Sequence, residues 1–207
     1  MHVDELLTAD GVAAVTAAVS RAERATSGEI VPIVVAHSDA YADVRLAAAA
    51  LVALALGGLG LELEPALARW FAPTQICVFA ALFWLFGRRP ILRALLPNAF
   101  ATERVHRAAS LAFHDAGLVE TRERTGILIY VSLLERRVQI VADRGVHGRV
   151  ADGTWDGVVE RVLAGIRAGR AEEGLIDGIR LCGEILAASF PPRADDRNEL
   201  PDRPRGG

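Results

Sequence analysis

The chain has 207 residues, of which 52% are apolar and 24% are charged, and its formal net charge is −3. This composition excludes a disordered or fibrous protein. A net charge so close to zero gives no excess of positive charge that would attract a polyanion, so no nucleic-acid partner is expected. The 23 basic residues are all arginine, which excludes any mechanism that needs a lysine.

The common signatures of secretion and cofactor chemistry are missing from the sequence. The first ten residues, MHVDELLTAD, have neither the basic nor the apolar stretch of a secretion signal. Cys77 and Cys182 match no metal motif and no disulfide framework. Since no Walker loop, dinucleotide-binding glycine pattern or GxSxG elbow occurs, neither an organic cofactor nor a serine nucleophile is expected.

The first predicted elements are a helix and a strand. Thr8 or Asp10 can cap a helix whose valines recur at helical spacing, and Gly28 breaks it. The β-branched run over residues 30–36 predicts a buried strand. Pro32 cannot donate to a strand ladder, so it predicts an edge or a bulge at that point.

Two uncharged stretches follow, residues 46–61 and 71–87, joined by a short polar link. Each is shorter than the roughly 20 residues that cross a bilayer, but together they predict a transmembrane helical hairpin over residues 44–97. The alternative is a pair of buried core helices. Trp70 and Trp84 lie near the predicted ends, as interfacial aromatic residues do. Small residues would let the two helices pack closely in lipid: Ala47, Ala50, Gly57 and Gly60.

The placement of arginines predicts the orientation of the hairpin. Arg45 precedes it and Arg88, Arg89 and Arg93 follow it, whereas the link carries only Arg69, beside two glutamates. The positive-inside rule then places both ends of the hairpin, and the soluble domain, on the cytoplasmic side of the inner membrane. We therefore expect a multi-pass membrane protein with membrane lipid as a partner. The arginines at the base of the hairpin are suited to anionic headgroups.

Beyond the hairpin, the pattern predicts a helix over residues 102–116 and two strands over 127–132 and 138–142, separated by a five-residue turn. Two further helices are predicted over residues 154–168 and 174–189. The first two strands flank a crossover and are expected to be parallel, with the third antiparallel to the second.

These elements predict an α/β fold in which a small mixed sheet is flanked by helices and interrupted by the two-helix transmembrane hairpin. The domain is expected in two parts, residues 1–43 and 98–190, on either side of the hairpin at 44–97. Residues 191–207 are rich in proline and charge and nearly devoid of apolar side chains, so a disordered tail is expected there.

Several segments of the soluble part resemble the TPM domain family: TSGEIVPIVVA, TGILIYVSLLERRVQIVADRG, Trp155 within a helix, and RAGRAEEGLIDGI. The resemblance spans about residues 8–40 and 101–190. This family includes thylakoid-lumen proteins and many bacterial membrane-associated proteins. The resemblance implies an α/β sandwich. It also implies divalent-metal binding and acid phosphatase activity for some members, and photosystem repair or receptor assembly for others.

Sheet geometry predicts one candidate metal site. If the first two strands are parallel and the third runs back, the start of the first and the end of the third share one edge, which brings Glu29 near Asp143. Carboxylate oxygens are ligands for hard cations, so Glu29 and Asp143 are the candidate ligands for Ca²⁺ or Mg²⁺. The alternative is an ordinary ion pair between Glu29 and Arg144 or Arg124.

The opposite edge of the predicted sheet carries His37, Asp39 and Glu135, which we expect to be solvated. His106 and His114 lie two helical turns apart, too far to share one metal ion.

Two functions follow from this reading. The first is a membrane-anchored interaction or assembly module for another membrane protein, favoured by the hairpin and by the lack of a convergent catalytic set. The alternative is a divalent-metal-dependent acid phosphatase, which the family resemblance and the Glu29/Asp143 pair would support.

Overall fold

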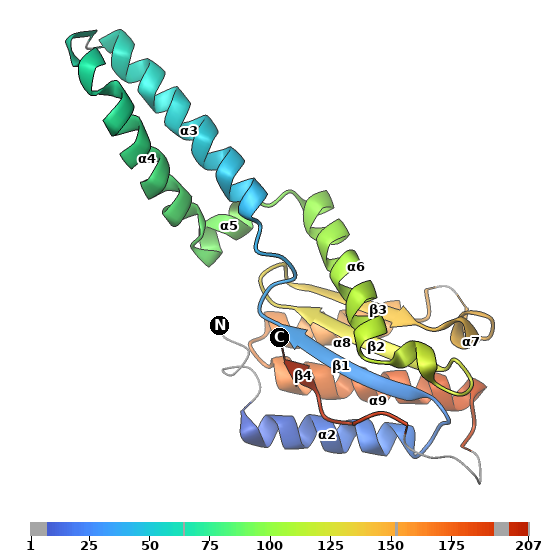
Figure 1. Ribbon diagram of the computed structural model, residues 1–207. Coiled ribbons are helices and arrows are strands. Elements are labelled where there is room, and N and C mark those ends of the chain that lie inside the picture. The colour runs from blue at the N-terminus through green and yellow to red at the C-terminus, as the bar shows by residue number, and fades with distance from the viewer. Residues whose placement is uncertain (1–7, 64, 152, 193–198, 207) are drawn as a thin grey trace. The chain divides into compact units, whose positions relative to one another are not determined.

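The computed structural model describes residues 8–63, 65–151, 153–192 and 199–206 (Figure 1). The chain divides into two compact units. One combines residues up to Ser38 with those from Thr102 onward, and the other comprises Asp39–Ala101. Segments far apart in the sequence therefore build one α/β unit, and the residues between them build a helical one.

The α/β unit contains a sheet with the strand order β3-β2-β1-β4. Strand β1 (Glu29–Val35) is parallel to β2 (Gly126–Ser132), and β3 (Arg137–Ala142) is antiparallel to β2. The two-residue strand β4 (Arg205–Gly206) is parallel to β1. The predicted α/β class and mixed sheet are thus confirmed, including the direction of each of the three longer strands.

The central strand β2 is buried at every position, which explains its unbroken apolar sequence. Alternate side chains enter two separate cores. Ile127 and Ile129 belong to one core, and Leu128 and Tyr130 belong to the other.

Helices cover both faces of this sheet (Figure 1). Helices α2 (Ala9–Glu23), α8 (Asp156–Arg167) and α9 (Ala171–Ser189) contribute to the first core. Helix α6 (Asn98–Asp115) and the 3-10 turn η2 (Leu118–Glu120) contribute to the second. A short helix, α7 (Arg144–His147), directly follows β3.

The sequence located most of these helices to within a few residues. Thr8 caps α2 as expected, because its hydroxyl oxygen accepts a hydrogen bond from the Gly11 N–H at 3.1 Å. Helix α6 begins four residues before its predicted start, at Asn98. Helix α7 was not predicted; it is a single turn that Asp143 caps.

The helical unit contains α3 (Ala42–Leu63), η1 (Pro65–Trp70), α4 (Phe71–Phe86) and α5 (Arg89–Leu95). Helices α3 and α4 pack side by side (Figure 1). The buried residues of α3 are Ala49 and Ala53, and α4 has none. Small residues do mediate the contact: at Gly57, one of the predicted set, a Cβ atom would lie 2.9 Å from Phe71 Cε2 of α4.

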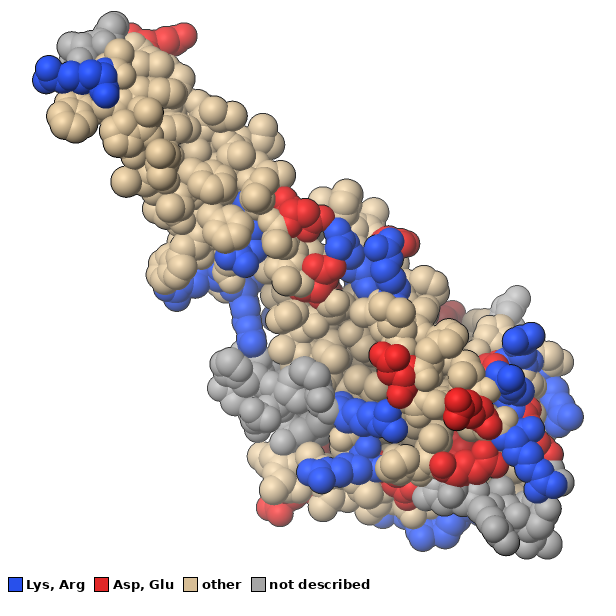
Figure 2. Space-filling view, in the orientation of Figure 1, with Lys and Arg blue, Asp and Glu red and all other residues tan. Residues whose placement is uncertain are grey.

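Two helical stretches of this unit, Ala42–Leu63 and Ala68–Phe86, are long and apolar enough to cross a membrane, with mean hydropathies of 2.0 and 1.3. Only 11% and 6% of these apolar windows are buried. In the described structure they are therefore not packed as the buried core helices of the alternative interpretation would be. Figure 2 shows an uncharged surface along them, with charged side chains at the two ends.

The C-terminal segment differs from the expected disordered tail. Of residues 191–207, the structure describes 191–192 and 199–206, and it places β4 beside Ile33 and Val34 of β1. Leu200 packs against the second core. Composition alone suggested disorder, but the Leu200 side chain and the pairing of β4 with β1 place this segment against the edge of the sheet. The remainder of the predicted tail lies outside the described residues.

Candidate functional site

Glu29, Gly126 and Asp143 form a row across one edge of the sheet. Glu29 is opposite Gly126 in the β1–β2 register, and the Asp143 N–H donates to the Gly126 carbonyl at 2.9 Å. Residues in register on neighbouring strands point to the same face. Both carboxylates are buried, with exposed fractions of 8% for Glu29 and 6% for Asp143. The structure thus places the two predicted ligands on one edge, with one residue between them.

Leu118 covers the middle of this row. A Cβ atom at Gly126 would lie 2.8 Å from Leu118 Cδ2 and 2.9 Å from Leu118 O, so only glycine fits there. Leu118 itself is fully buried. The two carboxylates therefore flank a leucine, and each has its own set of neighbours.

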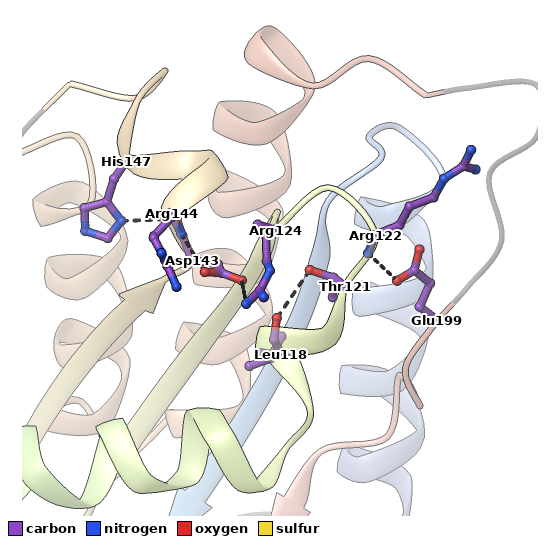
Figure 3. A network of polar contacts seen from close by, with 8 residues as sticks. All are labelled: Leu118, Thr121, Arg122, Arg124, Asp143, Arg144, His147 and Glu199. Atoms are coloured by element: carbon purple, nitrogen blue, oxygen red, sulfur yellow. Dashed lines mark hydrogen bonds and ion pairs between the residues drawn. The ribbon is translucent and has the colours of Figure 1, made fainter.

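Asp143 organises the start of α7 (Figure 3). Its Oδ1 accepts a hydrogen bond from the Arg144 N–H at 2.7 Å, which caps the helix. Its Oδ2 lies 3.8 Å from Arg124 Nη1 and accepts no hydrogen bond from the described residues. The His147 Nδ1 lies 3.2 Å from the Asp143 carbonyl oxygen. The expected arginine ion pair is therefore present, but it involves Asp143.

The loop that carries Arg124 is pressed against α7. Arg124 adopts a left-handed conformation with φ of 57°, and its carbonyl accepts from the Gly145 N–H at 3.0 Å. A Cβ atom at Gly145 would lie 2.5 Å from the Glu123 carbonyl oxygen and 2.6 Å from that of Arg124. Gly145 is thus required by close approach of the two backbones, and this contact holds Arg124 beside Asp143.

Glu29 faces the C-terminal segment. Its Oε1 accepts a hydrogen bond from the Glu199 N–H at 3.0 Å. Glu199 Oε2 accepts in turn from the Arg122 N–H at 3.0 Å (Figure 3). The segment that follows α9 is thereby tied both to the start of β1 and to the loop before β2.

A second acidic side chain, Glu23, lies beside Glu29. Glu23 Oε1 accepts from the Ile30 N–H at 2.9 Å. Burial raises the pKa of Glu23 to about 8, and the negative charges of Glu29 and Asp202 add to this rise, against the lowering effect of the Ile30 N–H. Glu23 is therefore largely protonated at neutral pH and hydrogen-bonds to Glu29. The sequence analysis missed Glu23, although its position at the end of α2, six residues before Glu29, was a usable signal.

The neighbouring hydroxyl groups serve the backbone. Thr26 Oγ1 donates to the Phe190 carbonyl at 2.7 Å and accepts from the Gly28 N–H at 3.2 Å. Thr125 Oγ1 donates to the Ser27 carbonyl at 3.1 Å. These bonds fasten the start of β1 to the end of α9, so neither hydroxyl is directed toward a cation.

The two carboxylates supply fewer oxygen ligands than a hard cation needs. Ca²⁺ takes six to eight oxygen ligands and Mg²⁺ takes six. Within the described part of the chain, no group of three or more His, Cys, Asp or Glu side chains is placed to hold a metal ion. The row supplies one carboxylate on each side of Leu118, and these two groups do not form a closed metal site. A metal role for Glu29 and Asp143 stays a prediction.

At the opposite edge, Glu135 is more than a solvated side chain. Its Oε1 accepts from the Ser38 N–H at 2.9 Å, and its Oε2 accepts from the fully buried Ser132 hydroxyl at 2.5 Å. The Tyr130 hydroxyl donates to Ser38 Oγ at 3.4 Å, and burial raises the pKa of Tyr130. Glu135 thus fixes the end of β1 to the β2–β3 turn.

Comparison with known proteins identifies the domain. Residues 93–185 match the family model described as the TPM domain. Residues 93–185 form a TPM domain. The resemblance inferred from the sequence is thereby confirmed, and the matched residues include β2, β3 and α8. Strand β1 precedes the matched range, yet it pairs with β2 at the centre of the TPM sheet.

A solved structure also shares this fold. The NMR structure of the BA42 protein from the psychrophilic bacterium Bizionia argentinensis aligns with a TM-score of 0.63 and 23% sequence identity. The alignment covers 99% of this chain and 98% of BA42. At that identity the similarity concerns the fold. No curated protein matches the chain.

Proposed function

We propose that residues 44–97 anchor the TPM domain in the inner membrane and that the protein acts as an interaction or assembly module for membrane proteins. The observation that carries this proposal is the exposure of α3 and α4, which are apolar around their whole circumference. A helix that is hydrophobic on all sides is stable only when protein or lipid surrounds it. Since little of either helix is buried, lipid is the surrounding medium that fits.

The size of the exposed apolar surface supports the same conclusion. Eleven large hydrophobic side chains between Leu46 and Leu85 are exposed, among them Leu51 at 70% and Ile76 at 69%. Fully removing one such side chain from water contributes about 2 kcal/mol, and these side chains are exposed by roughly half, so the set represents a driving force on the order of 10 kcal/mol. Patches of this size on soluble proteins mark membrane or protein contacts.

The charges at the ends of the hairpin favour one topology. Four arginines lie at its base, Arg45, Arg88, Arg89 and Arg93, against Arg69 in the link. By the positive-inside rule, the base and the TPM domain lie on the cytoplasmic side.

A groove between α3 and α4 supports a partner within the membrane. It has a volume of about 260 Å³ and is lined by Gly57, Gly60, Trp70, Thr74 and Gln75, among others. The Gln75 side chain lies against Gly57 and makes no hydrogen bond to another described residue. An amide in an apolar span gains from a hydrogen bond across to another membrane helix, and the glycines allow close approach.

The test is cross-linking of the full-length protein in native membranes, followed by identification of the captured proteins. Substitution of Gln75 by Leu keeps the helix apolar and removes the amide. Substitution of Ile76 by Ala, at a position outside the groove lining, is the matched control. We expect one membrane protein to be captured by wild type and I76A and lost with Q75L. Equal capture by all three proteins would contradict the proposal, as would extraction of the wild type from membranes by alkaline carbonate.

A second candidate function is a divalent-metal-dependent acid phosphatase. It is favoured by the buried Asp143, whose Oδ2 accepts no hydrogen bond from the described residues. Ca²⁺ or Mg²⁺ would be held through Asp143 and Glu29 and would supply positive charge to a phosphate ester. The assay is hydrolysis of a chromogenic phosphate ester with added metal and with chelator. Asp143→Asn retains a capping oxygen, so equal activity of wild type and D143N would remove this candidate.

A further inference from the structure

One end of the helical hairpin carries a cluster of arginines around short helix α5. Arg45 lies near the start of α3, Arg88 is the N-cap of α5, and Arg89 and Arg93 lie within α5. Helix α5 contacts both α3 and α4, so these arginines gather at the same end of the hairpin. They divide into side chains that hold the helices together and side chains that point into the surroundings.

Arg45 belongs to the first kind. Its Nη2 donates to the Phe83 carbonyl at 3.2 Å, and its guanidinium carbon lies 4.3 Å from the centre of the Phe83 ring. A Cβ atom at Gly87 would lie 2.7 Å from the same nitrogen. Arg45 thus satisfies a carbonyl in the last turn of α4 and fixes the start of α3 beside the end of α4.

Arg88 and Arg93 belong to the second kind. Both are exposed, and neither forms an ion pair with another described residue. The Arg88 guanidinium carbon lies 3.9 Å from the centre of the Trp84 ring, and Trp84 is 63% exposed. Within α5, Leu92 is buried, whereas the next residue, Arg93, is exposed.

The height of the hairpin places these cations at the level of lipid headgroups. From Trp70 to Trp84 the rise is about 21 Å, and from Arg45 to Glu62 it is about 26 Å, at 1.5 Å per residue. The hydrocarbon core of a bilayer is about 30 Å thick. An apolar hairpin shorter than the core draws its flanking residues toward the interface. Arg88 and Arg93 therefore meet phosphate groups before they reach bulk water.

We propose that Arg88, held by Trp84, and Arg93 bind the phosphate groups of anionic phospholipids. This inference rests on the proposed membrane anchoring. A guanidinium presents paired N–H donors that match phosphate oxygens, and the Trp84 ring holds the Arg88 plane in position. A lipid with net negative charge is preferred over a zwitterionic one, because each added arginine near the surface favours it by about fivefold.

The experiment uses the full chain in bilayers with Trp84 as the reporter. Trp70→Phe and Trp155→Phe leave Trp84 as the only tryptophan. Its fluorescence is quenched by brominated phosphatidylglycerol or, at the same mole fraction, by brominated phosphatidylcholine. We expect several-fold stronger association of Trp84 with the anionic lipid, and loss of that preference with R88Q/R93Q. Arg69→Gln is the matched control, because Arg69 also lies over an aromatic ring, that of Trp70 at 6.0 Å in the native chain, but at the far end of α4, and Trp70→Phe keeps a ring there.

The outcomes separate this inference from the anchoring proposal. Strong quenching by both brominated lipids with no preference between them would overturn the lipid site and leave the anchoring intact. No quenching by either lipid would refute both. Removal of the preference by millimolar inorganic phosphate, at matched ionic strength, would assign the arginines to free phosphate and overturn the lipid proposal. A preference that R69Q lowers as much as R88Q/R93Q would also overturn it.

Discussion

Protonation of Glu23 makes the stability of the TPM domain depend on pH. Its pKa is about 8 in the folded protein against 4.5 for an unperturbed glutamate, so the folded state binds the proton more tightly than the unfolded state. The stabilisation is complete below pH 4.5 and is lost as pH rises through 8. The free energy of unfolding therefore falls by up to about 1.4 kcal/mol per pH unit in this interval. From pH 5.5 to 7.5 the loss amounts to about 2 to 3 kcal/mol.

Glu23→Gln isolates this effect. The glutamine carbonyl accepts from the Ile30 N–H, and its amide donates to Glu29, so the variant imitates protonated Glu23 at every pH. We expect E23Q to match wild type at pH 5 and to exceed its stability by about 2 kcal/mol or more at pH 8. Denaturant unfolding in detergent micelles, followed by Trp155 in a W70F/W84F background, measures this, because Trp155 packs against the first core.

The control for this prediction is Glu184→Gln. Glu184 is exposed and pairs with Arg180 on the surface of α9, so its replacement changes stability little at any pH. Parallel pH profiles for wild type and E23Q would refute the reasoning, because they would show that Glu23 is ionised in the folded protein at neutral pH.

Three further predictions concern the site and its edge. Gly145→Ala destabilises the domain by about 1 to 3 kcal/mol, because the new Cβ meets two carbonyl oxygens, whereas Gly148→Ala, in open space, changes thermal stability by less than about 0.5 kcal/mol. Asp143→Ala lowers the free energy of unfolding by about 1 kcal/mol through loss of the α7 cap. Asp143→Asn, which keeps a capping oxygen, retains most of that stability in the same denaturation assay. Removal of residues 192–207 takes Leu200 from the second core and lowers stability by about 1 to 3 kcal/mol, whereas unchanged unfolding would show that the segment contributes nothing.

The sequence predicted the α/β fold because its signals are local and strong. The run from Ile127 to Ser132 is apolar at every position but the last, as a strand buried on both faces must be. The short polar turn before Arg137 indicated that β3 is antiparallel to β2. The long crossover before Gly126 indicated that β2 is parallel to β1. The two apolar stretches are equally plain, since each lacks charge over more than four helical turns.

The candidate site was only partly predictable, because its contacts depend on register and on distant segments. Strand order alone placed Glu29 and Asp143 on one edge. It did not reveal that Leu118 lies over Gly126, since a 3-10 turn has no periodic signal. Glu199 approaches Glu29, and Asp202 approaches Glu23, through a segment whose composition resembles disorder, so local patterns did not predict these contacts.

The central claim is that α3 and α4 cross the membrane and leave the TPM domain on the cytoplasmic side. Reporter fusions inserted after residue 66 and joined to the C-terminus test it most directly, with one reporter active only outside the cytoplasm and one active only inside. The account predicts that the fusion at residue 66 reports the outside and the C-terminal fusion reports the inside. Cytoplasmic signal from both positions would show that the hairpin does not span the bilayer and would contradict the account.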